Sequence, residues 1–320
     1  MNLKIDRFIL SIIAVITIAY FFPQWGSQDS DVPIDLISTV GISLIFFFYG
    51  LKLSPTKLKA GLKNWKLHAL IQLSTFLIFP LLILLFRPLI QNNEHETIWL
   101  AFFFLAALPS TVSSSVVMVS IAKGNIPAAI FNASISGIIG IAITPLWMGL
   151  FIDNSQTHFD FTDIYIKLIL QIILPVILGL FLQRFWGDFA QKHNKKLTRF
   201  DKSVILLIIY KSFAESFSEN IFSSVSVIDL MLLLVGVLFL FYLVFYLTGA
   251  LSKILCFDKE DQITAQFCGT KKSLVHGTVF SKILFANMAT IGIILLPLML
   301  FHAIQLLIIS MIASKKSRAI

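Results

Sequence analysis

The feature that most constrains this chain is a series of long apolar runs separated by short polar connections. Each run has about 20 residues, which is the length that an α-helix needs to cross a hydrocarbon core of roughly 30 Å. Hydrophobic residues make up 57% of the sequence and charged residues only 13%, and the mean hydropathy is +0.89. Soluble domains carry about 25% charged residues. The pattern therefore predicts an all-α, multi-pass integral membrane protein.

Ten runs are long enough to span a membrane, and the polar residues Lys211 and Glu215 make the seventh the weakest of them. The spans are predicted at residues 5–23, 33–53, 63–86, 97–122, 126–151, 161–185, 201–219, 227–255, 261–285 and 290–313. Lysine and arginine are concentrated at both chain ends and in alternate connections between the spans. The other connections contain a single cation, Arg87. Because short cytoplasmic loops are rich in these residues, we expect both termini in the cytoplasm.

The ten spans divide into two halves, 1–151 and 152–320, with five spans each. An odd number per half means that any structural repeat is inverted across the membrane. The fourth span of each half is interrupted, by Pro109 with a run of hydroxyl residues and by Gly269 with two lysines. Interrupted segments at matching positions of two halves indicate a binding site near the middle of the membrane.

The first interruption combines a helix breaker with groups that can bind a ligand. Pro109 removes a backbone donor, and hydroxyl side chains can satisfy the freed backbone groups. Ser113, Ser114 and Ser115 would then stand at the start of a second half-helix, where hydroxyls and N–H groups face a ligand. The alternative is that these serines only pack closely or bond to their own backbone.

The second interruption places Lys271 and Lys272 in the middle of an apolar span, between Thr270 and Ser273. A lysine at the bilayer centre costs roughly 2.5–3.5 kcal/mol, so we expect a compensating partner. Glu215 is the acid that lies well inside a predicted span, which predicts a pair with one lysine and leaves the other for an anionic substrate. His276 follows on the same helix face and either titrates or has a structural role.

Further polar side chains interrupt neighbouring apolar spans. Gln72 and Thr75 lie in the third span, and Asn132 and Ser134 lie in the fifth. Together with the two interruptions they are expected to line one cavity between spans three, four, five and nine. The two cysteines have no metal-ligand spacing, so neither a metal site nor a cofactor is expected. The cations lie between apolar runs, which argues against nucleic acid as a partner.

Several motifs resemble those of the bile acid:sodium symporter superfamily. The resemblance is strongest to an orphan branch that comprises bacterial proteins and the seventh vertebrate member. The matching segments are 50–54, 107–115, 122–125, 132–134 and 269–274. The resemblance covers essentially the whole chain. It implies a panel domain of helices 1, 2, 6 and 7 and a core domain of helices 3, 4, 5, 8, 9 and 10. It also implies that helices 4 and 9 are unwound and cross, and that the protein lies in a bacterial inner membrane.

The sequence departs from the sodium-coupled members of this superfamily at the positions that the resemblance assigns to Na⁺. Phe267 takes the place of an acid and Lys271 that of a glutamine, while Ser114 and Ser115 replace a serine and asparagine pair. Sodium needs oxygen ligands, and a lysine ammonium repels it. Sodium coupling is therefore in doubt, and a fixed ammonium could replace the bound cation. The coupling ion stays open between Na⁺, H⁺ and none.

The function expected from the resemblance and the residues is transport of a small or amphipathic organic anion by alternating access, with membrane lipid as the surrounding partner. Two alternatives stay open. A serine with a desolvated lysine could form the dyad of an intramembrane hydrolase, although no oxyanion donors are identifiable and we expect no enzyme. The chain could also be a regulator of cation homeostasis that transports nothing.

Overall fold

A computed structural model describes residues 7–26, 32–53, 64–89, 93–111, 113–152, 166–218, 220, 226–285, 288 and 290–319, and for a few of these, among them Ser113, the backbone alone. Every regular element in these ranges is helical. The α-helices are α1 (Arg7–Phe21), α2 (Ile34–Lys52), α4 (Trp65–Leu73), α5 (Phe79–Leu84), α6 (Asn93–Ala107), α7 (Ser113–Ile121), α8 (Ile126–Gly149), α10 (Leu174–Lys192), α11 (Asn194–Ser218), α12 (Val227–Ile254), α13 (Lys259–Thr270), α14 (Leu274–Leu284) and α15 (Ile291–Ala319). Short 3-10 helices form at η1 (Pro23–Trp25) and η3 (Arg87–Leu89), and π-helical turns at η2 (Ser74–Ile78) and η4 (Ile169–Ile173).

Six of the described helical segments are long and apolar enough to cross a membrane. They are Ile34–Lys52, Trp65–Leu84, Ile126–Gly149, Ile166–Lys192, Val227–Ile254 and Ile291–Ser317. Two shorter apolar helices, Leu10–Phe21 and Glu96–Ala107, overlap further predicted spans. The helical class and the apolar character expected from the sequence are confirmed, whereas the count of ten spans and their orientation stay predictions.

The chain forms two compact units that are each assembled from separate stretches of sequence. Unit 1 comprises Met1–Ser54, Ile152–Ser226 and Thr278–Leu295. Unit 2 comprises Pro55–Phe151, Val227–Gly277 and Leu296–Ile320. The division falls inside α14 and α15, so each of these helices contributes residues to both units.

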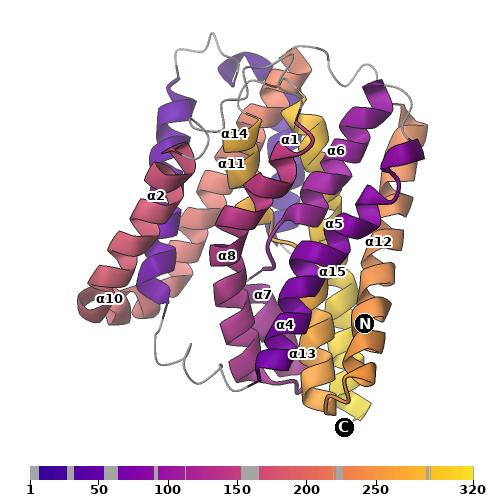
Figure 1. The fold of residues 1–320 in the computed structure, drawn as a ribbon. Coiled ribbons are helices and arrows are strands. Elements are labelled where there is room, and N and C mark those ends of the chain that lie inside the picture. The colour runs from indigo at the N-terminus through magenta and orange to yellow at the C-terminus, as the bar shows by residue number, and fades with distance from the viewer. Residues whose placement is uncertain are drawn as a thin grey trace. The chain divides into compact units, whose positions relative to one another are not determined.

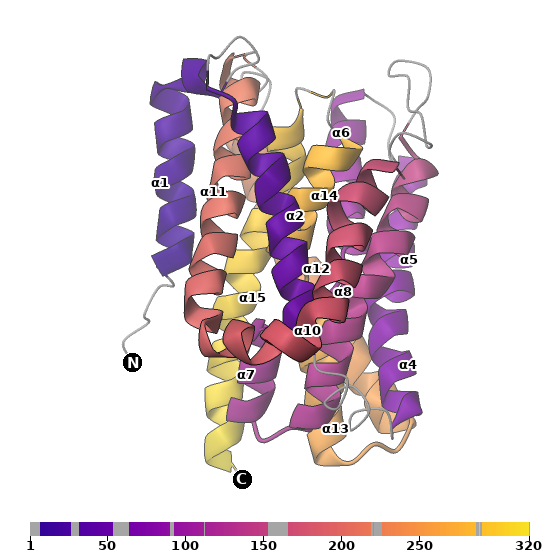
Figure 2. The same cartoon turned by 90° about the vertical axis from the view of Figure 1, so that its left-hand side faces the viewer.

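Unit 1 is held together by pairs of packed helices. Helix α1 lies along α11, and α2 lies along α10, as Figure 2 shows. The contact between α2 and α10 is made by glycines: a Cβ on Gly50 would lie 2.3 Å from the Val176 carbonyl oxygen. A Cβ on Gly179 would lie 2.2 Å from the Phe47 carbonyl oxygen. The two backbones therefore touch where small residues allow close approach, as is common between membrane helices.

Unit 2 contains the interrupted helices. Helices α4 and α5 continue one another through the π-helical turn η2 (Figure 1). This rod packs on α6 and α13, while α7 packs on α8 and α12 packs on α13. Unit 2 also contains the segments between α6 and α7 and between α13 and α14.

One buried carboxylate joins the starts of three helices in unit 2. Asn64 caps α4, Asn125 caps α8, and Asp258 caps α13 by accepting from the Asp261 N–H. The amides of both asparagines also donate to the buried Asp261 carboxylate, Asn125 at 2.8 Å. The partial positive charge at helix N-termini favours an anion at this position.

Asp261→Ala is expected to lower the thermal stability of the protein. The substitution leaves two asparagine amides without their acceptor, and an unsatisfied buried donor costs about 1–3 kcal/mol. The unfolding midpoint of the purified protein in detergent measures the effect. Glu260→Ala, at an exposed position in the same turn of α13, is the control and should leave the midpoint unchanged. Equal midpoints for both variants would show that the Asp261 junction carries no stability.

Candidate functional site

Helices are interrupted at two places in unit 2, and the two interrupted segments are hydrogen-bonded to each other. Helix α6 ends at Ala107 and α7 begins at Ser113, while α13 ends at Thr270 and α14 begins at Leu274. The Ser273 N–H donates to the Pro109 carbonyl oxygen at 2.9 Å. The Ser110 hydroxyl donates to the Cys268 carbonyl oxygen at 2.7 Å. Backbone groups freed in one helix are thus satisfied by the other.

The carbonyl groups at the end of α6 take their donors from side chains. The last carbonyls of a helix have no partner within it. Thr144 of α8 donates to the Ala107 oxygen at 2.8 Å, and the Lys272 ammonium donates to the oxygens of Ala106 at 2.6 Å and Leu108 at 2.8 Å. In return the Ser110 N–H donates to the Ser136 hydroxyl at 2.9 Å. The carbonyls of Ala106, Ala107 and Leu108 and the Ser110 N–H therefore all have side-chain partners.

Lys272 is completely buried, with 0% of the residue exposed, and its charge is compensated by backbone dipoles. In addition to the two oxygens of α6, its ammonium donates to the Thr75 carbonyl oxygen at 2.7 Å. It also lies 4.1 Å from the centre of the Phe79 ring, a cation–π contact. An ammonium has three N–H donors. All three therefore have an acceptor.

The Thr75 carbonyl is available because of the turn that contains it. In the π-helical turn η2 the Phe79 N–H donates to the Ser74 carbonyl instead of to Thr75. The next residue, Pro80, has no N–H. Neither of the usual helical donors thus reaches the Thr75 oxygen, which leaves it for Lys272. π-helical turns of this kind occur frequently at functional sites.

Gln305 of α15 holds the backbone of Lys272 from the other side. The Lys272 N–H donates to Gln305 Oε1 at 2.9 Å, and Gln305 Nε2 donates to the Lys272 carbonyl oxygen at 2.8 Å. The amide side chain thus replaces the helical bonds that an unwound residue lacks. The sequence analysis did not single out Gln305, although a glutamine within an apolar run is the signal that could have found it.

Lys271 is equally buried but points to a different part of the site. Its ammonium donates to the Ser114 carbonyl oxygen at 2.8 Å and lies 3.5 Å from the Ser114 hydroxyl. That hydroxyl donates to Thr111 Oγ1 at 3.0 Å, and Thr111 bonds to Ser115 at 2.8 Å. Within the described residues the Lys271 ammonium has one close acceptor, against three for Lys272.

The other predicted site residues divide into two groups. Gln72 donates to Asn132 Oδ1 at 3.0 Å, and the Asn132 amide lies 2.8 Å from His68 Nδ1, which gives a buried polar chain between α4 and α8. Ser273 and His276 bond to each other at 2.9 Å. Ser134 and Thr270 are also buried in unit 2, whereas the side chain of Ser113 lies outside the described part. The common cavity expected from the sequence stays a prediction.

The acid that was expected beside the lysines has another partner. Glu215 belongs to unit 1, and its carboxylate lies 3.3 Å from Lys211, four residues earlier in α11. Lys272 obtains its compensation from three carbonyls and an aromatic ring instead of an acid. The expectation that a buried lysine here requires Glu215 is therefore corrected for Lys272. Carbonyl dipoles suffice when three of them converge on one ammonium.

Comparison with known proteins relates this chain to transporters. The chain is 37% identical to PA2026 of Pseudomonas aeruginosa and 36% identical to YfeH of Escherichia coli, and each match covers 98% of this chain and 93% of the relative. It is 31% identical to the sodium/bile acid cotransporter 7 of Xenopus tropicalis, over 96% of this chain and 90% of the relative. A family model matches residues 6–318. The chain is thus an integral membrane protein of a transporter family and no enzyme, and it belongs to the SBF-like CPA transporter family.

Proposed function

We propose that this protein carries a small or amphipathic organic anion across the membrane by alternating access and contains its own fixed cation, Lys272. The family and the cotransporter name of its vertebrate relatives support transport. The observation that carries the proposal is the buried Lys272 ammonium, which three backbone carbonyls surround where two helices are interrupted.

The environment of Lys272 resembles one that would suit a metal cation. Backbone carbonyl oxygens can replace the hydration shell of an alkali ion, as they do in ion channels. Here the ammonium already uses those oxygens, and a second cation placed beside it would be repelled at short distance. Transport by this chain is therefore expected to proceed without Na⁺.

Lys271 is the group that we assign to the substrate. With a single close carbonyl acceptor among the described residues, its ammonium keeps donors for a carboxylate or sulfonate. The N-termini of α7 and α14, which follow the two interruptions, add partial positive charge. The hydroxyls of Thr111, Ser114 and Ser115 supply further polar contacts beside it.

The division into units supports alternating access. Unit 1 contains α1, α2, α10 and α11, which fall in the expected panel helices 1, 2, 6 and 7, and in addition residues 278–295 of α14 and α15, which fall in the expected core helices 9 and 10. Both interruptions begin in unit 2, which corresponds to the expected core. We propose accordingly that the core helices move against the panel helices, in a ten-span bacterial inner-membrane protein with cytoplasmic termini.

Uptake into proteoliposomes tests the proposal. Taurocholate and benzoate serve as probes, with an inward Na⁺ gradient, an inward proton gradient or neither. We expect saturable uptake of an anion that Na⁺ does not change. Lys271→Gln is expected to raise the KM for the anion by about tenfold or more, because a hydrogen bond to a charged group contributes about 1.5–3 kcal/mol.

Lys253→Gln, at an exposed position in the last turn of α12, removes a lysine from the surface and serves as the control. It should leave the KM unchanged. A strict requirement for Na⁺ in the unmodified chain would refute the role of Lys272. Equal uptake of cations and neutral solutes would refute the anion carrier, and failure of every anion to enter would favour a regulator that transports nothing.

A further inference from the structure

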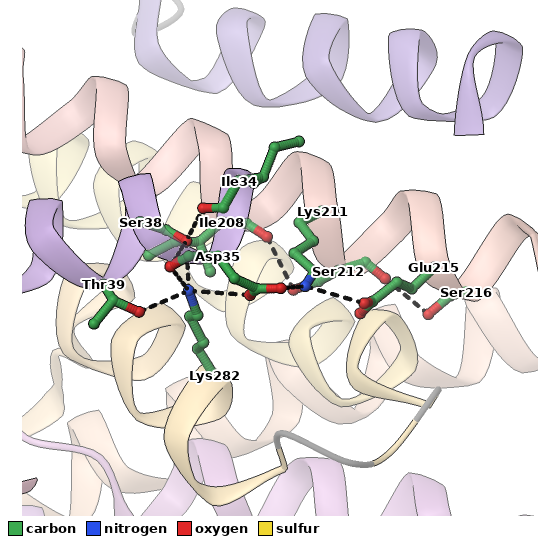
Figure 3. A network of polar contacts seen from close by, with 10 residues as sticks. All are labelled: Ile34, Asp35, Ser38, Thr39, Ile208, Lys211, Ser212, Glu215, Ser216 and Lys282. Carbon is green, nitrogen blue, oxygen red and sulfur yellow. Dashed lines mark hydrogen bonds and ion pairs between the residues drawn. The ribbon is translucent and has the colours of Figure 1, made fainter. Parts of the chain in front are cut away.

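A second cluster of charges lies in unit 1 and uses none of the residues assigned to transport. Figure 3 shows Lys211 of α11 and Lys282 of α14 on either side of the Asp35 carboxylate, in the first turn of α2. Lys211 bonds to Oδ2, and Lys282 lies 3.3 Å from Oδ1. Each carboxylate oxygen thus faces its own ammonium. We call Lys211 and Lys282 the lysine clamp.

The lysines are fixed, whereas the carboxylate is accessible. The side chains of Lys211 and Lys282 are 15% and 18% exposed, and that of Asp35 is 64% exposed. Lys282 is anchored further by the Asp35 carbonyl oxygen at 3.0 Å, the Ser38 hydroxyl and the Thr39 hydroxyl at 3.4 Å. The anion is therefore the component of the cluster that can leave while the cations stay in place.

The charges of the cluster indicate which ligand could take the place of the Asp35 carboxylate. Glu215, with a side chain that is 14% exposed, lies 3.3 Å from Lys211. Two lysines and two acids give a net charge of zero in the present arrangement. When Asp35 withdraws, two positive charges and one negative charge leave a net charge of plus one. A monovalent anion restores neutrality, and a dianion exceeds it.

We propose that the lysine clamp is a binding site for a monovalent carboxylate, and that the Asp35 side chain occupies it in this structure as a tethered ligand. A free carboxylate offers the same two oxygens that Asp35 now offers. Exchange is feasible because the Asp35 side chain is 64% exposed, so that water can solvate its carboxylate when it leaves the lysines. This site is independent of the proposed transport function, because it uses other residues and can be tested by binding alone.

Asp35→Asn tests the proposal by removing the charge of the tethered ligand and keeping its size. Binding of benzoate to the purified protein in detergent is measured by isothermal titration calorimetry, in a Lys271→Gln background so that the proposed transport site does not contribute. We expect benzoate to bind at least about tenfold more tightly to the Asp35→Asn variant. Adding Lys282→Gln should abolish the gain, and neutral benzamide should show none.

The pair of Lys52 and Asp201 provides a matched control in the same unit. This pair also joins α2 to α11, with 3.6 Å between Lys52 Nζ and Asp201 Oδ2. The Asp201 side chain is only 17% exposed, and among the described residues it forms an ion pair with one lysine instead of two. Asp201→Asn should therefore create no benzoate site. No gain in a monodisperse Asp35→Asn protein would overturn the proposal. So would an equal gain with benzamide or with Asp201→Asn.

Discussion

Lys272→Met is expected to reduce anion uptake by at least about 100-fold. Methionine keeps much of the length of lysine but has no donor, so the carbonyls of Thr75, Ala106 and Leu108 lose their partner. Each buried acceptor left unsatisfied costs about 1–3 kcal/mol, and a total near 3 kcal/mol corresponds to roughly 100-fold. Initial rates of taurocholate uptake, at matched amounts of monodisperse protein, measure the loss. An uptake rate near that of the unmodified chain would contradict the role of Lys272.

Lys272→Ala separates the loss of a cation from general damage to the fold. Alanine leaves space beside the same three carbonyl oxygens, which are suitable ligands for an alkali ion. Added Na⁺ is therefore expected to restore part of the uptake, and choline is expected to restore none. Lys253→Ala, on the exposed surface, controls for the removal of a lysine as such.

Gly50→Ala is expected to prevent much of the protein from folding. The added Cβ would lie 2.3 Å from the Val176 carbonyl oxygen and 3.0 Å from the Cα of Gly179. Backbone atoms cannot turn aside as a side chain can, so α2 and α10 must separate. Overpacking of this kind costs about 1–3 kcal/mol and occasionally more. The yield of monodisperse protein and its unfolding midpoint measure the effect.

Gly187→Ala in α10 is the matched control for this prediction. A Cβ there would meet the flexible end of the Gln183 side chain, at 2.9 Å, instead of another backbone. The side chain can move, so yield and midpoint should stay close to those of the unmodified protein. If both alanine variants behave alike, the close approach of α2 and α10 is not what limits folding.

The helical membrane class could be predicted from the sequence because it depends on the length and apolar character of the runs alone. Pro109 and the adjacent hydroxyls predicted an interruption in the segment between α6 and α7. Two lysines in an apolar run predicted another in the segment before α14. These signals concern chemistry at single positions. They need no knowledge of which segments meet in space.

The partners of the lysines could not be predicted, because two kinds of information are missing from a sequence. The acceptors of Lys272 are carbonyl oxygens, which every residue has, so no side chain marks them. Glu215 is the exception, because its spacing of four residues from Lys211 is visible in the sequence and indicates the pair that forms. Lys282 and Asp35 come from distant parts of the chain and meet only in the folded unit.

The coordination of Lys272 by backbone atoms has a consequence for evolution. Substitutions at positions 75, 106 and 108 can alter every side chain there and still leave the three oxygens in place. Residue identities at these three positions therefore do not indicate whether the oxygen ligands are kept. The identity of the residue at position 272 is the informative one. A homologue with a small residue at position 272 would have three carbonyl oxygens without a ligand. A single substitution could thus replace the lysine side chain by a cation from solution.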